Sequence, residues 1–185
     1  MITVYTGQAK GKTTSALGEA LLAHSQGKRV LMVQFLKGST YSGELMGLNR
    51  LGIPLIQFGV GCRWAGMIRT GLKHCTGCGE CFRQNRTPEV GLELVHLAMQ
   101  YVSGEVQANT YDLIILDEVS HALNHNFLDL DQLRELLLRS SSLHWILTGR
   151  KMPETLKSMV DSWWELTMLK HPFSKGVKSR RGIEY

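Results

Sequence analysis

A short turn that ends in Lys-Thr-Thr is the first part of this sequence whose residue types and spacing could do chemistry. Its residues are, in order, Gly7, Gln8, Ala9, Lys10, Gly11, Lys12, Thr13 and Thr14. Backbone N–H groups of such a turn, with the N-terminus of a following helix, bind phosphate oxygens. We therefore predict a nucleotide site along the turn, in which Lys12 pairs with the phosphates and the Thr13 hydroxyl binds Mg²⁺. Three residues, one fewer than in the standard phosphate-binding loop (P-loop), separate Gly7 from the Gly-Lys pair.

Two adjacent carboxylates are the second chemical signal. Asp117 and Glu118 end the strongly apolar run 112–117, which predicts a strand buried on both faces. The carboxyl end of that strand would place them at the edge of the sheet, beside the P-loop. Carboxylate oxygens there can hold Mg²⁺ directly or through water, so we predict Mg²⁺ ligands in Thr13 and in Asp117 or Glu118.

All four cysteines fall within one stretch of twenty residues: Cys62, Cys75, Cys78 and Cys81. The last three have the spacing Cys-x₂-Cys-x₂-Cys, which suits a [4Fe–4S] cluster with Cys62 as the fourth ligand. They also suit a structural Zn²⁺ of Cys₄ type, or of Cys₃His type with the adjacent His74. Four reduced thiols in a loop are the third alternative, and the sequence leaves all three open.

Strand-like and helix-like segments alternate along the chain and must position these groups. Apolar runs predict strands over 2–5, 29–35, 54–58, 112–117, 143–148 and 163–169. Apolar residues at helical spacing predict helices over 12–26, 43–51, 89–103 and 129–139, and a short helix starting at Pro153. Buried strands separated by helices predict an α/β, RecA-like P-loop NTPase fold, with a mostly parallel central sheet and helices on both faces.

The pattern predicts a single domain over residues 1–185. An irregular loop rich in Cys, Gly and Arg would interrupt it over 60–88, and a basic segment would close it over 170–185. An irregular loop of that length inside a compact domain is usually functional.

Composition and charge exclude several classes of function. With 43% apolar and 20% charged residues the chain can bury a core. It has no apolar run near the ~20 residues that span a bilayer and no secretory signal pattern, so we expect a cytoplasmic protein without a membrane partner. The net charge of +5 is concentrated in 61–88 and 170–185, each with five basic residues and one acidic residue. Two such segments around a P-loop favour a triphosphate over nucleic acid, which we do not expect as a partner.

Taken together, these residues resemble the P-loop type of ATP:corrinoid adenosyltransferases over nearly the whole chain. The matching motifs are Lys10–Thr14, Leu116–Leu123, Thr148–Arg150, Lys170–Phe173, Gly176–Lys178 and Gly182–Tyr185. Where the family has Phe-Thr-Trp after its third strand, this chain has Cys62-Arg63-Trp64, and the cysteine-rich loop is an unusual insertion.

The resemblance implies transfer of the 5′-deoxyadenosyl group of ATP to the cobalt of a reduced cob(I) corrinoid, with release of tripolyphosphate. The implied catalytic residues are Lys12, Thr13, Glu118 and Arg150. Arg150 would neutralise the phosphates, Trp64 would line the corrinoid face, and Lys178 in the basic segment would contribute to the ATP or corrinoid site.

Two other functions stay open at this point. One is an ATP-hydrolysing P-loop protein whose cysteine loop senses a metal or a redox state, and the other is a non-catalytic carrier of nucleotide or corrinoid. The expected cofactors are ATP, Mg²⁺ and the corrinoid substrate, with Zn²⁺ or [4Fe–4S] at the cysteines. Beyond these small molecules, a reductant, a corrinoid-dependent partner protein and a second copy of the chain in a homodimer are candidate partners.

Overall fold

A six-stranded sheet, parallel throughout, forms the centre of the protein. The computed structural model describes residues 1–38, 43–76 and 78–170. The strands are β1 (Ile2–Thr6), β2 (Val30–Phe35), β3 (Leu55–Phe58), β4 (Leu113–Asp117), β5 (His144–Thr148) and β6 (Ser162–Glu165). Their order across the sheet is β3-β2-β4-β5-β1-β6, and every neighbouring pair is parallel. The predicted α/β class and parallel sheet are therefore confirmed.

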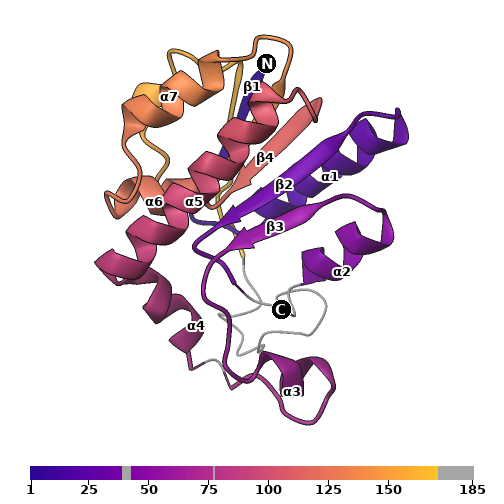
Figure 1. Cartoon of the computed structure of the whole chain (residues 1–185), viewed down its shortest axis with the longest axis vertical. Helices are drawn as coiled ribbons and strands as arrows, with labels where there is room; N and C mark the ends of the chain where they lie inside the picture. The colour runs from indigo at the N-terminus through magenta and orange to yellow at the C-terminus, as the bar shows by residue number, and fades with distance from the viewer. Residues whose placement is uncertain (39–42, 77, 171–185) are drawn as a thin grey trace.

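Helices cover both faces of this sheet (Figure 1). One face carries α1 (Lys12–Ser25) and α2 (Gly43–Arg50), and the other carries α5 (Pro88–Gln107), α6 (Val119–Asn124) and α7 (Leu130–Leu138). No helix in the described ranges is both long and apolar enough to cross a membrane.

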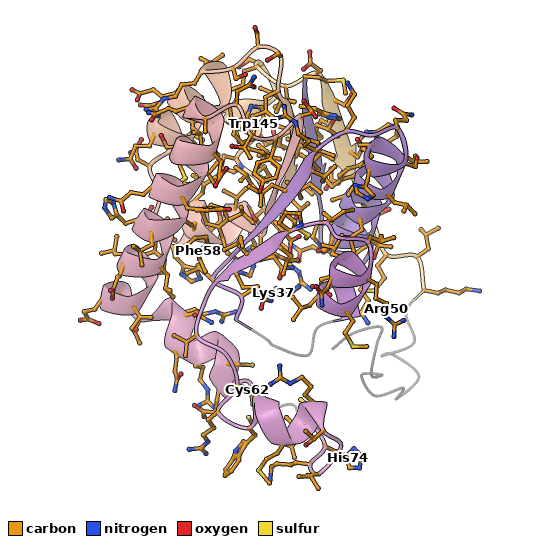
Figure 2. The ribbon with its side chains drawn as sticks, turned by 45° about the vertical axis from the view of Figure 1, so that its right-hand side comes forward. Lys37, Arg50, Phe58, Cys62, His74 and Trp145 are labelled. Carbon is orange, nitrogen blue, oxygen red and sulfur yellow. The ribbon has the colours of Figure 1, made fainter. Side chains whose placement is uncertain are left out.

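Successive residues of the central strands point into two different cores. In β2, Leu31 and Val33 pack towards α5, α6 and α7, whereas Val30 and Met32 pack towards α1 and α2. Because both faces are covered, such strands are apolar at every position rather than at alternate positions. Trp145 in β5 is the bulkiest fully buried side chain in the described part of the chain and lies in the first core (Figure 2).

The segment between β3 and α5 differs from its prediction. Within the stretch 60–88, expected to be irregular, the structure has α3 (Ala65–Arg69), α4 (Glu80–Arg83) and the 3-10 turn η1 (Gln84–Arg86). Helices of four or five residues span barely more than one turn, which is too short to show an apolar period. The segment extends beyond the carboxyl end of β3, away from the sheet (Figure 1).

Four further elements differ from expectation. α5 continues to Gln107 instead of ending at 103, through a last turn whose Ser, Gly and Glu residues hide the period. The short helix after Pro153 is only the 3-10 turn η2 (Glu154–Leu156), and α6 was not predicted. The strand expected over 163–169 ends at Glu165, because the next residue, Leu166, turns its carbonyl towards the N–H of Ala9.

The carboxyl ends of the parallel strands meet at one edge of the sheet, where ligands bind in open α/β folds. The P-loop follows β1, Asp117 ends β4, and the Thr148–Arg150 turn follows β5. β5 lies between β4 and β1, but Asp117 still lies beside the P-loop as predicted, because it accepts a hydrogen bond from Thr13. The predicted residues therefore come from three consecutive strands of the sheet.

A pair of Leu→Ala variants tests the division between core and surface. Leu147 in β5 is fully buried, whereas Leu22 on α1 is 63% exposed. We expect Leu147→Ala to lower the free energy of unfolding in urea by about 2–5 kcal/mol, because it leaves a cavity. Leu22→Ala should change it by no more than about 0.5 kcal/mol. Equal losses in both variants would contradict the described core.

Candidate functional site

The P-loop is closed by contacts within the loop and by the chain after β6. Lys12, the first residue of α1, is only 5% exposed, and its Nζ donates a hydrogen bond of 2.7 Å to the carbonyl of Ala9. The N–H of Ala9 donates in turn to the carbonyl of Leu166, at 3.3 Å. Gly7 has φ +107°, and a Cβ built on it would lie 2.3 Å from that same carbonyl oxygen. Only glycine fits at this position.

The other loop residues divide between the interior and the surface. Gly11, with φ +111°, immediately precedes α1, and the Thr13 side chain is half-buried. Gln8, Lys10 and Thr14 are exposed on the outer side of the turn. The interior of the loop is therefore formed by the backbone and the Lys12 side chain.

Asp117 is the centre of a hydrogen-bond network at the end of β4. It is completely buried, and its Oδ1 accepts hydrogen bonds from the hydroxyls of Thr13, at 2.8 Å, and Thr148, at 2.6 Å. Its Oδ2 accepts a third from the side-chain amide of Gln34, at 2.9 Å. The carboxylate thus joins β4 to α1, β5 and β2.

Glu118, the next residue, is held differently. It has a left-handed backbone with φ +59°, immediately before α6, and its N–H donates to the Thr148 hydroxyl at 3.1 Å. Its Oε2 is buried and accepts no hydrogen bond from the described residues. His121 Nε2 lies 3.5 Å away, but burial lowers the pKa of that imidazole and favours its neutral form. Strained backbone and an unpaired buried oxygen are features that collect at functional sites.

The predicted catalytic residues lie close enough to Glu118 for their charges to affect its pKa. Burial, followed by the charge of Asp117, raises the pKa of Glu118, while Lys12, Lys37 and Arg150 act in the opposite direction. Burial lowers the pKa of Lys12, and Glu118, Arg150 and Asp117 also act on this lysine. Four of the residues predicted from sequence therefore lie within electrostatic range of one another.

Arg150 enters this group from the turn after β5. Its side chain is exposed, and its backbone carbonyl accepts a hydrogen bond of 3.1 Å from the amide of Asn124, near the end of α6. The turn and α6 are thereby held together.

A second group of charged side chains, largely shielded from solvent, was not predicted from the sequence. Lys37, just after β2, bonds to Glu44 and lies 3.9 Å from Asp117 Oδ2. Burial opposes its charge, but the carboxylates of Asp117 and Glu44 hold the pKa of Lys37 above its usual value. The Gln34 amide also donates to Glu44, at 3.1 Å. The available signal was a glutamine in an otherwise apolar strand, since Gln34 is the register partner of Asp117.

Of the two residues predicted to face the substrates, Trp64 lies apart from this group, and Lys178 is not described. Trp64, in the segment after β3, is 40% exposed, and its ring is contacted by Lys73 Nζ at 4.9 Å and by the Arg63 guanidinium at 5.4 Å. Lys178, together with the other basic residues after Lys170, lies outside the described residues.

The cysteines lie in the segment beyond β3. None of the four forms a disulfide: Cys62, Cys75 and Cys81 are half-buried and Cys78 is exposed. Burial raises the pKa of the Cys81 thiol, and charge on Cys62 adds to the effect. In the ranges that the structure describes, no three His, Cys, Asp or Glu side chains are already arranged around a metal position.

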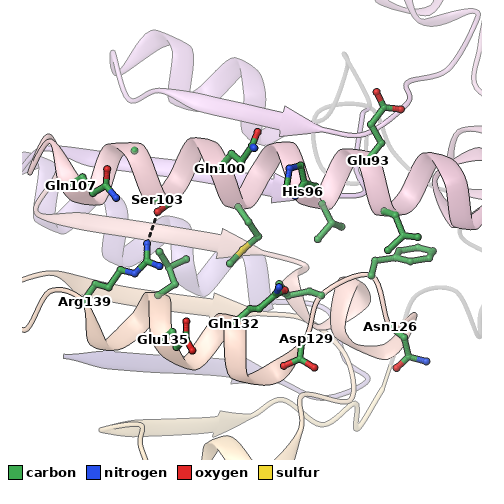
Figure 3. Close-up of a pocket in the computed structure, with 17 residues that line it drawn as sticks. Glu93, His96, Gln100, Ser103, Gln107, Asn126, Asp129, Gln132, Glu135 and Arg139 are labelled. Carbon is green, nitrogen blue, oxygen red and sulfur yellow. Dashed lines mark hydrogen bonds between the residues drawn. The ribbon is translucent and has the colours of Figure 1, made fainter.

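A groove of about 1000 Å³ lies between α5 and α7, away from the P-loop (Figure 3). Arg139, immediately after α7, donates a hydrogen bond across it to the Ser103 hydroxyl of α5, at 2.6 Å. None of the residues predicted from sequence lines this groove. The predicted nucleotide-binding residues lie at the carboxyl edge of the sheet and not in this groove.

Comparisons with known proteins agree with these motifs. The family model described as ATP:corrinoid adenosyltransferase BtuR/CobO/CobP matches residues 1–185. The corrinoid adenosyltransferase of Escherichia coli is 30% identical over 186 residues, which cover 100% of this chain and 85% of that protein. That of Salmonella typhimurium is also 30% identical with the same coverage, and that of Pseudomonas aeruginosa is 27% identical over 188 residues, covering 100% and 83%. The chain belongs to the ATP:corrinoid adenosyltransferase family.

Proposed function

We propose that this protein transfers the 5′-deoxyadenosyl group of ATP to the cobalt of a cob(I) corrinoid and releases tripolyphosphate. The observation that carries the proposal is the group of Lys12, Glu118 and Arg150 around a shortened P-loop, in a chain that matches the family over its whole length. In this reaction the Co–C5′ bond forms with the electron pair of cobalt. The C5′–O5′ bond breaks, and its electron pair leaves on the tripolyphosphate.

The P-loop and its cations suit a triphosphate that must depart as a unit. The helix α1 begins at Lys12, so its first N–H groups face the loop, and anions bind well at such a helix start. The charges of Lys12 and Arg150 lie within electrostatic range of each other and would stabilise the charge that builds on the leaving oxygen. Cobalt is the nucleophile, so no protein nucleophile is needed. Positioning the two reactants in line contributes the rest of the rate.

The carboxylates and Thr13 fit a Mg²⁺ ion at the phosphates. Asp117 already accepts three hydrogen bonds, whereas the Oε2 of Glu118 is buried without one, which suits a carboxylate that binds a cation. The Thr13 hydroxyl donates a hydrogen bond to Asp117, so the lone pairs of its oxygen stay available to a metal ion. Bound Mg²⁺ would supply positive charge at the triphosphate. We assign Thr13 and Glu118 as the protein ligands of Mg²⁺. Asp117 would position Thr13 through its hydrogen bond without binding the ion itself.

Product analysis tests the proposed reaction against its alternatives. The full chain would be incubated anaerobically with ATP, Mg²⁺ and chemically reduced cobalamin. We expect tripolyphosphate and a light-sensitive adenosylcorrinoid in equal amounts. ADP and phosphate as the only products would indicate an ATPase and overturn the proposal, and tight binding without any product would indicate a carrier and also overturn it.

Replacement of Glu118 should separate stability from activity. Glu118→Gln removes a half-buried carboxylate whose Oε2 accepts no hydrogen bond from the described residues, so the free energy of unfolding without ligand should rise by about 0.5–2 kcal/mol. The rate of adenosyl transfer should fall by about 100-fold, because the Mg²⁺ ion at the phosphates loses a carboxylate ligand. The exposed Glu135→Gln on α7 is the matched control and should change neither quantity. A destabilised Glu118→Gln protein with full activity would refute the assigned role.

Two Gly→Ala variants test the shape of the P-loop. Gly7→Ala forces a Cβ against the Leu166 carbonyl, so ATP affinity measured by calorimetry should fall by about 10–100-fold as the loop is displaced. Gly18→Ala, within α1, meets open space and should raise the free energy of unfolding by about 0.5–1 kcal/mol without changing ATP affinity. Unchanged ATP binding in Gly7→Ala would contradict a phosphate-binding role for this turn.

A further inference from the structure

We propose that Cys62, Cys75, Cys78 and Cys81 form a tetrathiolate site for a thiophilic metal centre, either one Zn²⁺ or one [4Fe–4S] cluster. Nothing in adenosyl transfer requires such a centre, so the proposal stands independently of the function proposed above. It rests on the packing, hydrogen bonds and charge of the segment between β3 and α5.

The segment over 59–87 has too small an apolar core to hold itself together. Among its described side chains only Ala65 and Ile68, both on α3, are buried and apolar. The side chains that pack against this pair are those of Cys62 and Cys75. Segments with so little apolar burial usually need a metal or disulfides for stability, and none of the four cysteines here forms a disulfide.

The other three cysteines lie in the neighbourhood of Cys81, at the start of α4. The charges of Cys62, Cys75 and Cys78 all act on its thiol, which places the other three within electrostatic range of it. Cys62 also accepts a hydrogen bond on Sγ from the N–H of Trp64, at 3.4 Å. N–H groups directed at sulfur are typical of metal-bound thiolates, where they stabilise the negative charge.

One buried amide ties the two ends of the cysteine segment together. Asn85 is 1% exposed, accepts a hydrogen bond from the Val60 N–H, and donates to the Val60 carbonyl at 3.1 Å. It also donates to the Cys81 carbonyl at 2.6 Å. The strand end that leads into Cys62 is thereby fixed beside the helical turn that carries Cys81, although 19 residues separate the two cysteines in sequence.

The charge of the segment complements a thiolate centre. Four thiolates around Zn²⁺, or around the usual oxidised cubane cluster, leave two negative charges. Residues 61–88 contain one acidic residue, Glu80, and five basic residues: Arg63, Arg69, Lys73, Arg83 and Arg86. Arg83 also donates from its guanidinium to the Cys78 carbonyl, at 3.1 Å. The surrounding cations would offset the two negative charges of the bound centre.

Binding must still draw the sulfurs to one point, because no three candidate ligands in the described ranges are placed around a metal position. The exposed Cys78 has to move the furthest inward. Metal binding commonly supplies the free energy for such local ordering. The centre would then fix a segment whose backbone, at Gly59, packs against the backbone of Lys37, so close that a Cβ on Gly59 would lie 2.4 Å from the Lys37 nitrogen.

Metal analysis of the untagged full chain, purified anaerobically and washed with chelator, tests the proposal. About one Zn²⁺ per chain in a colourless protein supports the zinc form. About four Fe and four sulfide per chain, with visible absorption that is lost in air, supports the cluster form. A folded protein without retained metal, in which a thiol reagent titrates all four cysteines at once, overturns the proposal.

Single substitutions identify the ligands. Cys62→Ser, Cys75→Ser and Cys81→Ser should each lower metal affinity by about tenfold or more. Thr76→Ala changes an exposed side chain between two of the ligands and should keep the full metal content. The urea unfolding transition checks that each variant is folded, and metal content does not depend on adenosyl transfer, so the two proposals can fail separately. Full metal retention in the three Cys→Ser proteins would overturn the site.

Discussion

The buried carboxylate of Asp117 is the interaction on which the rest of the site depends. A charge with no solvent exposure is tolerated only where hydrogen bonds or opposite charges compensate it, and removing one partner from such a group commonly costs several kcal/mol. The compensating donors come from the start of α1, from β2 and from β5, through Thr13, Gln34 and Thr148. The one side chain therefore fixes the distance between the P-loop helix and the strands that carry the other functional residues, before any ligand binds.

The two adjacent acids consequently have different roles. Asp117 is fully hydrogen-bonded and is a poor candidate to exchange its partners for a ligand. Glu118 has a left-handed backbone, and its buried Oε2 accepts no hydrogen bond from the described residues. The charges of Lys12 and Arg150 act on its carboxylate. The desolvation cost that raises its pKa is the kind of cost that a bound cation offsets. In this arrangement the network around Asp117 positions the group, and Glu118 is the carboxylate left to act on a ligand.

Strands and motifs that are encoded in one continuous stretch of sequence could be predicted. Groups of side chains that come from several stretches could not. Continuous apolar runs revealed the parallel strands, and the Gly-to-Thr spacing revealed the P-loop at the end of β1. The group of Lys37, Glu44 and Gln34 was missed because its three members are brought together by the pairing of β2 with β4 and by α2, which no local pattern encodes. The short helices α3, α4 and α6 were missed because one or two turns do not establish a period.

The shortened P-loop has a structural explanation in the contacts of Ala9. Both backbone groups of this residue are engaged, the N–H with the carbonyl of Leu166 and the carbonyl with the Nζ of Lys12. Ala9 therefore serves to hold the loop against the chain that follows the edge strand β6, and we infer that the phosphate donors are the N–H groups after it, towards the start of α1. A loop with one residue fewer has less backbone to wrap around the terminal phosphate. That suits a reaction at C5′, in which the triphosphate must leave intact, better than one in which a single phosphoryl group is transferred.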